Sequence, residues 1–313
     1  MTLHQAQEVD CPELYALLKS EHPPTILDIL PPEYYEKIRI PSALNACAFN
    51  ADFIDLVQEI SADQNDLIVV YGVGEDSLDW RVAVDKLHHA GYSNVSVLKA
   101  GIEGWVEAGY SVDGTEKKIQ EDDRVFSIQG ERRWKIDSEQ SVLEWQGRKS
   151  TGHHHGTIKV SGHIFEENGE LRGTIFADMK TIQDVDLEGD PLKPVLEHHL
   201  NSEDFFFTKL FPTAKFEITK TELNEVQSIT YPQILATGTL TVRGVSHTIE
   251  VPLVITDLDE TTISIETHFD IDRTKWGIIY GSSRFFRHLS YHKVFDIFSA
   301  QCLLYGELSP PNQ

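Results

Sequence analysis

The chain has 313 residues, of which 40% are hydrophobic and 25% are charged, so it is long enough for two domains with ordinary cores. Its formal net charge is −23, and such acidity repels the phosphates of nucleic acids and of anionic membrane surfaces. We therefore expect no nucleic-acid partner. No run approaches the ~18 apolar residues that cross a bilayer, so we do not expect an integral membrane protein.

The first third of the chain alternates short apolar strands with amphipathic helices. Residues 25–30 (TILDIL), 66–72 (DLIVVYG) and 94–98 are expected strands. Between them, residues 52–60 and 77–90 carry apolar side chains at helical spacing. This alternation predicts a parallel sheet with helices packed against it.

A polar stretch separates this part from the rest of the chain. Residues 114–131 lack a sustained apolar period, and we interpret them as a linker. The expected organisation is therefore a first domain at 1–113, a second domain at 132–308 and a short tail at 309–313.

The second domain shows the alternation that is typical of half-buried strands. Residues 236–245 and 262–271 alternate branched or aromatic side chains with polar ones. Turn signals at 167–169 and 257–259 fall between such runs, and 191–200 is the one helix that we expect here. Mostly antiparallel strands over this length predict a closed barrel or a sandwich.

The cysteines indicate a reducing compartment. Cys11, Cys47 and Cys302 are odd in number, widely spaced and without CxxC pairing, which argues against a disulfide framework. The first ten residues, MTLHQAQEVD, have neither a basic start nor an apolar stretch, so we expect no secretory signal and a cytoplasmic location. We expect Cys47 to be a buried structural thiol and Cys11 to be unreactive.

Three segments of the first domain carry a family resemblance. They are the strand that ends in Asp28, the segment PPEYYEKIRIPSA (31–43) and the segment GYSNVSVLKAGIEGW (91–105). Across about residues 5–113 the chain resembles the rhodanese-like family. That resemblance implies a cysteine that opens a loop after the central strand and carries sulfur as a persulfide, which requires a thiolate of lowered pKa.

This chain has no cysteine in that loop, which consists of Gly72, Val73, Gly74, Glu75, Asp76 and Ser77. The cysteine position aligns with Gly72 from the strand or with Gly74 from the helix. Ser77 or Asp79 replaces the arginine that the family has near the end of the loop, and Arg39 replaces its histidine. We therefore predict a pseudoenzyme without sulfurtransferase activity and, by elimination, a docking or regulatory domain.

Four segments of the second domain match a second family in its order. They are residues 134–162, 199–218, 238–253 and 269–286. Over about residues 133–308 the chain resembles the YceI family, which implies a lipocalin-like, antiparallel, eight-stranded β-barrel with an elongated cavity. Some members bind long isoprenoid chains such as those of quinones. The expected fold class is thus multidomain, α/β followed by all-β.

The resemblance and the aromatic content together suggest a set of ligand-binding residues: Trp145, His154, Phe176, His199, Phe205, Phe206, Phe216, Trp276, Phe285 and Phe286. Three consecutive phenylalanines at 205–207 cannot all face inward on one strand, because side chains alternate. We expect at least one to line an entrance, a helix contact or an interface such as a homodimer contact. We expect no cofactor beyond a bound isoprenoid or quinone.

The histidines raise the question of a metal. Three consecutive imidazoles at 153–155 cannot all converge on one ion from one strand, so only His153 and His155 could share a face. His288 and His292 have helical spacing, but their segment reads as a loop that leads into a strand. We therefore predict no metal site. The main alternative to lipid carriage is a protein–protein scaffold without a ligand; sulfur transfer and metal-dependent chemistry rank lower.

Overall fold

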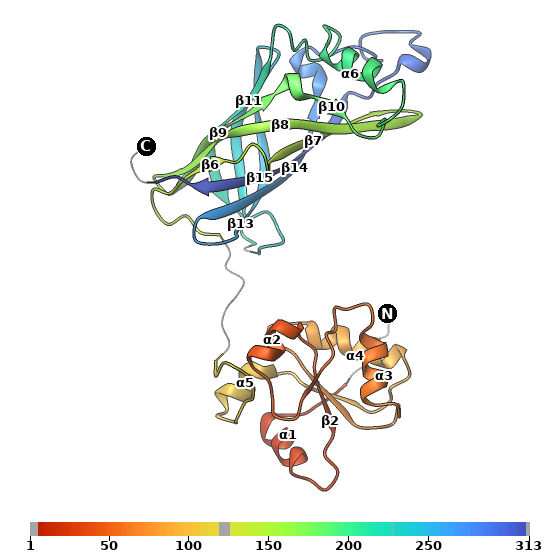
Figure 1. Ribbon diagram of the computed structural model, residues 1–313, viewed down its shortest axis with the longest axis vertical. Coiled ribbons are helices and arrows are strands. Elements are labelled where there is room, and N and C mark those ends of the chain that lie inside the picture. The colour runs from red at the N-terminus through yellow and green to blue at the C-terminus, as the bar shows by residue number, and fades with distance from the viewer. Residues whose placement is uncertain (1–5, 119–125, 227, 311–313) are drawn as a thin grey trace. The chain divides into compact units, whose positions relative to one another are not determined.

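The computed structural model describes residues 6–118, 126–226 and 228–310. The chain divides into two compact units, 1–121 and 122–313 (Figure 1). The structure does not describe residues 1–5, nor 119–125 of the expected linker, nor 311–313 of the expected tail. Across the described ranges, no helix is both long enough and apolar enough to cross a membrane.

The first unit is built on a five-stranded parallel sheet with the strand order β1-β5-β4-β2-β3. Its elements are β1 (Gln7–Glu8), α1 (Cys11–Leu18), β2 (Thr25–Asp28), α2 (Pro32–Lys37), β3 (Leu44–Asn45), α3 (Phe53–Ile60), β4 (Ile68–Tyr71), α4 (Asp79–His89), β5 (Val95–Leu98) and α5 (Gly101–Glu107). The expectation of a parallel sheet with helices packed on it is confirmed.

The central strand β4 is buried on both faces. Ile68 and Val70 pack into one hydrophobic cluster with side chains of α3 and α4, whereas Val69 and Tyr71 pack into another with side chains of α1 and α5. Successive side chains of a strand point to opposite faces, so each face of the sheet receives its own layer of helices. An uninterrupted apolar run is what this double cover requires.

The second unit is a closed antiparallel β-barrel (Figure 1). Its strands are β6 (Arg133–Ile136), β7 (Val142–Lys149), β8 (Gly152–Glu167), β9 (Glu170–Asp178), β10 (Gln183–Asp184), β11 (Thr213–Leu223), β12 (Ile234–Val242), β13 (Val245–Asp257), β14 (Thr262–Asp272) and β15 (Ile297–Leu308). The ten strands occupy eight positions around the barrel. The short strands β6 and β7 share the position between β15 and β8, and β10 and β9 pair with successive parts of β8. Pairing of β8 with β9 closes the barrel.

Two hairpins turn through left-handed backbone. Asn168 (φ 54°) and Gly169 (φ 79°) join β8 to β9, as the turn signal predicts. Arg243 (φ 51°) and Gly244 (φ 73°) join β12 to β13. The expected strand at 236–245 was therefore too long, because its last residues form this turn and begin the next strand.

The helix of the second unit, α6 (Lys193–Asn201), is followed by a turn that holds the aromatic triplet. The triplet does not lie on a strand, and Phe207 has a left-handed backbone with φ 46°. Phe205 and Phe206 pack against the barrel core, whereas Phe207 contacts the ring of Phe211. The turn, and not strand alternation, separates the three side chains. Three single-turn helices complete the unit: η1 (Met179–Thr181), η2 (Arg273–Trp276) and η3 (Ser290–His292).

Candidate functional site

The barrel encloses a cavity of about 120 Å³. All eight strand positions contribute to its wall, because the apolar side of each strand faces inward. Thr267 and Lys215 are the polar residues among those that line it. An engineered apolar cavity of about 150 Å³ stays dry and accepts benzene, so this hollow has room for an apolar group of similar size.

Two polar atoms at this wall are buried and make no hydrogen bond within the described residues. They are Trp145 Nε1 and Thr267 Oγ1. Buried polar groups are nearly always hydrogen-bonded, and leaving a donor unsatisfied costs about 1–3 kcal/mol. Both atoms are covered by neighbouring groups rather than open to the hollow, so the cavity itself presents an apolar surface.

A second cavity of about 50 Å³ adjoins the first. Trp145, Phe206 and Phe298 line both, so these three side chains form the partition between them. Arg273 borders the smaller cavity and is buried, and its guanidinium donates to the carbonyls of Phe295, Ile278 and Val294. The Arg273 side chain therefore ties together the segments beside the smaller cavity.

The structure brings together part of the expected ligand set. Trp145, Phe206 and Phe216 line the larger cavity, and Phe205 lines the smaller one. Trp276 is buried behind the wall, where its indole donates to the Leu240 carbonyl at 3.1 Å.

The remaining expected residues do not line either cavity. Phe176 lies on the outer face of β9, opposite Ser161, and is 36% exposed. Phe285 and Phe286 are exposed in the segment after η2, and His199 pairs with Asp204 at 3.0 Å on the surface of α6.

Sequence reasoning missed several wall residues. Phe269 on β14 and Phe298 on the paired strand β15 line the larger cavity, and so does Leu240 on β12. The signal that could have found them is the period of two along each strand, applied in place of aromatic identity.

All three thiols are buried. Burial raises the pKa of Cys302, which lines the larger cavity, to about 12. Burial, and then the charge of Asp10, raise the pKa of Cys11 above its usual range. Cys47 is buried, as expected.

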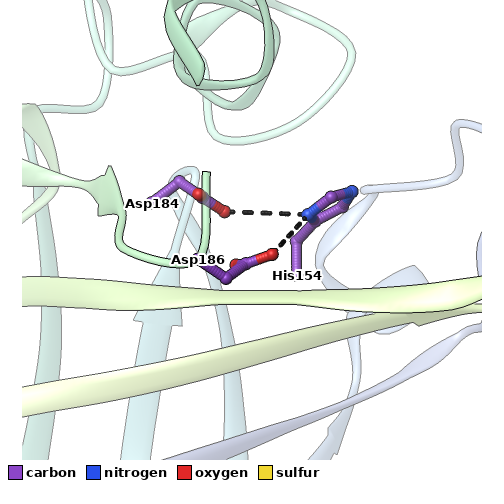
Figure 2. A group of neighbouring side chains, drawn as sticks. All are labelled: His154, Asp184 and Asp186. Carbon is purple, nitrogen blue, oxygen red and sulfur yellow. Dashed lines mark hydrogen bonds and ion pairs between the residues drawn. The ribbon is translucent and has the colours of Figure 1, made fainter. Parts of the chain in front are cut away.

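A histidine and two aspartates meet beside the barrel wall (Figure 2). His154 lies on β8, Asp184 ends β10 and Asp186 follows it. His154 Nδ1 is 3.0 Å from Asp186 Oδ2 and 3.9 Å from Asp184 Oδ2. Burial, together with the neighbouring Asp186, raises the pKa of Asp184. Burial also acts to raise the pKa of Asp186, but hydrogen bonds from the His155 N–H and from His154 outweigh it and hold that pKa at about 2.

The loop after β4 encloses a carboxylate of its own. Asp79 is buried and accepts hydrogen bonds from the Val73 N–H at 3.0 Å and the Trp80 N–H at 2.6 Å. A side chain added at Gly72 would meet the Asp79 carboxylate at 2.2 Å, and one added at Gly74 would meet Glu103 at 2.2 Å. The buried Asp79 carboxylate therefore fills the space beside Gly72, whereas the exposed Glu103 side chain could turn away from Gly74.

Asp28, at the end of β2, is enclosed at the same edge of the sheet. It accepts hydrogen bonds from the Tyr71 hydroxyl at 2.6 Å and the Leu30 N–H at 3.0 Å. Burial raises its pKa to about 6, although both hydrogen bonds act in the opposite direction. The Tyr71 hydroxyl in turn accepts the N–H of Ile40, so this pair links β2 and β4 to the segment after α2.

The closed antiparallel barrel with an apolar hollow defines the second unit as a lipocalin-like barrel. The YceI-like domain matches residues 134–296, and the rhodanese-like domain matches residues 10–108. The chain belongs to the YceI-like family, with a rhodanese-like domain ahead of the barrel. Both resemblances found in the sequence are confirmed.

Several solved structures are similar to parts of the chain. BcnA of Burkholderia cenocepacia is 18% identical, with a TM-score of 0.44 over 54% of this chain and 98% of BcnA. A polyisoprenoid binding domain from Saccharophagus degradans is 16% identical, with a TM-score of 0.43 over 56% of this chain and 98% of that one. Thiosulfate sulfurtransferase from Pseudomonas aeruginosa is 23% identical, with a TM-score of 0.32 over 36% of this chain and 21% of that one. No curated protein matches the chain.

Proposed function

We propose that the barrel binds and carries an apolar ligand of the isoprenoid, quinone or other lipid class, and that the chain is not an enzyme. The observation that carries this proposal is the cavity of about 120 Å³ inside the barrel, with a nearly all-apolar wall. Natural cores are filled to the density of organic crystals, so a hollow of this size is unusual unless something occupies it.

The energetics favour an apolar chain. Each buried methylene contributes about 0.8 kcal/mol, so a five-carbon isoprene unit contributes about 4 kcal/mol before entropic losses. A chain longer than the cavity would have to displace the partition made by Trp145, Phe206 and Phe298 and extend into the smaller cavity. In this proposal, a long ligand therefore passes through the space that these three side chains occupy in the empty barrel.

The test is to purify the full chain, extract it with organic solvent and identify the retained molecules by mass spectrometry. The stripped protein is then offered a quinone with an isoprenoid tail and a fatty acid, and binding is followed by tryptophan fluorescence, to which Trp145 at the cavity wall contributes. We expect at least one chain to be retained in stoichiometric amount. Folded protein that never retains an apolar chain from either source would refute the proposal.

For the first unit we propose a non-catalytic role in docking or regulation. The Asp79 carboxylate already takes the N–H of Val73 and fills the space beside Gly72, so an incoming thiosulfate anion would meet both a steric and a charge barrier. We expect no thiocyanate from thiosulfate and cyanide. Turnover above the uncatalysed rate would contradict this assignment.

A further inference from the structure

We propose that His154, Asp184 and Asp186 form a binding site for one divalent transition-metal ion, with zinc as the best match. Their ligand atoms all lie within 4.8 Å of one another (Figure 2). Zinc takes imidazole nitrogen and carboxylate oxygen at about 2.0–2.2 Å, which places tetrahedral ligands roughly 3.4 Å apart. The distances of 3.0 and 3.9 Å from His154 Nδ1 to the two carboxylates bracket that value.

Asp184 is buried, and one of its two carboxylate oxygens accepts no hydrogen bond in the part of the chain that the structure describes. Its side chain is 0% exposed, and its Oδ2, which points toward His154, receives no hydrogen bond from the described residues. Its other oxygen accepts the Leu187 N–H at 2.8 Å. Burying a carboxylate with one bare oxygen beside a second carboxylate is costly, and a cation between the two would remove that cost.

Asp186 is oriented in the same manner. Its Oδ1 accepts the His155 N–H at 2.9 Å, and its Oδ2 turns to His154. Each aspartate thus uses one oxygen to hold a backbone N–H and presents the other to the same point. Metal sites use such outer hydrogen bonds to fix the direction of their ligands.

The site has room for further ligands. The side chains of His154 and Asp186 are 27% and 26% exposed, whereas that of Asp184 is sealed. One imidazole and two carboxylates would therefore leave a position open to water. Three donors that include a nitrogen suit a transition ion better than calcium, which takes six to eight oxygens.

The local sequence explains how the three residues meet. Gly156 lies on β8 between Trp145 of β7 and Asp184 of β10. A Cβ at this position would lie 1.8 Å from the Gln183 carbonyl oxygen and 2.8 Å from the Trp145 ring. Only glycine lets β10 approach so closely, and His154, two residues earlier on the same strand, shares the inward face.

The prediction of no metal from the sequence considered histidines alone, in the tract at 153–155 and at His288 and His292. Alternation prevents His153, His154 and His155 from converging, but it does not address one imidazole that meets carboxylates about 30 residues further along the chain. The proposed site uses a single histidine of the tract.

The test uses tag-free, full-length protein that has been stripped with a chelator and dialysed. Titration calorimetry with zinc chloride and metal analysis after gel filtration measure affinity and stoichiometry. We expect about one zinc per chain, and we expect D184N and H154F each to weaken zinc binding by about 100-fold or more, since even outer-sphere changes cost 10–100-fold. H153A removes the neighbouring, exposed imidazole and is the matched control, which should bind as the wild type does.

Three results would overturn the proposal. They are a wild-type chain that retains no stoichiometric zinc, a D184N variant that binds zinc normally, and an H153A variant that loses as much affinity as H154F. The last result would assign any binding to the histidine tract. D186N serves as the second carboxylate variant if D184N does not fold, and circular dichroism of each stripped variant establishes that its barrel is intact.

Discussion

Replacing Ala214 by phenylalanine is expected to abolish ligand binding without destabilising the barrel. Ala214 on β11 lies opposite Ala177 on β9, and both line the larger cavity, so a ring at 214 would project into the hollow. An unfilled cavity costs about 24 cal/mol per Å³, so the 120 Å³ hollow costs the empty barrel about 3 kcal/mol. Filling it should leave the free energy of unfolding unchanged or raise it by up to that amount.

The same ring would exclude an apolar ligand. A214F adds six carbon atoms to the cavity wall, and they take the place of a similar number of ligand carbons. At about 0.8 kcal/mol for each buried carbon, the binding free energy falls by up to about 5 kcal/mol, which is more than a 1,000-fold loss of affinity. The assay is urea unfolding followed by pulsed alkylation of the buried Cys302, which reports on the barrel, together with binding measured by ligand retention. If A214F destabilises the barrel by 1–3 kcal/mol, the interior is already full and the reasoning fails.

Ala236 provides the matched control. It is fully buried in the barrel core but does not line the cavity. A236F should therefore overpack the core and lower the free energy of unfolding by about 1–3 kcal/mol. If A214F and A236F have equal free energies of unfolding, the cavity does not lower the stability of the empty barrel, and the reasoning fails.

Three further outcomes are expected. F206A should remove part of the partition between the two cavities and improve retention of longer chains relative to shorter ones in a competition assay; an unchanged preference would contradict the partition. The folded pKa of Asp28, about 6, lies above its ordinary 3.8, so the folded state binds the proton more tightly and stability falls as pH rises from about 4 to about 6. Between pH 4 and pH 7 the first unit should lose roughly 2.5 kcal/mol in urea unfolding, and D28N should lack this loss. G72C alone should gain no sulfurtransferase activity, because Asp79 fills the site; thiocyanate production by G72C would refute that steric argument.

The fold could be predicted because its patterns are periodic. The uniform apolar run that became β4 predicted a strand buried on both faces, and the alternation over 262–271 coincided with β14. The hairpin at Arg243–Gly244 was missed because alternation continues through a two-residue turn without interruption.

The site was harder to predict, because aromatic identity does not determine direction. Phe176 and Phe216 are both phenylalanines on paired strands, yet only Phe216 points inward. The meeting of His154 with the two aspartates depends on the register of a two-residue strand and on one glycine, and no local pattern encodes either.

The incomplete pairing of β13 with β14 has a kinetic consequence. These neighbouring strands pair only over Val254–Asp257 and Ile263–Glu266, so no ladder of backbone hydrogen bonds joins Val245–Leu253 to the second half of β14. If the barrel carries a guest molecule, that molecule could leave sideways through this seam, and its release rate would be independent of how much competitor is added.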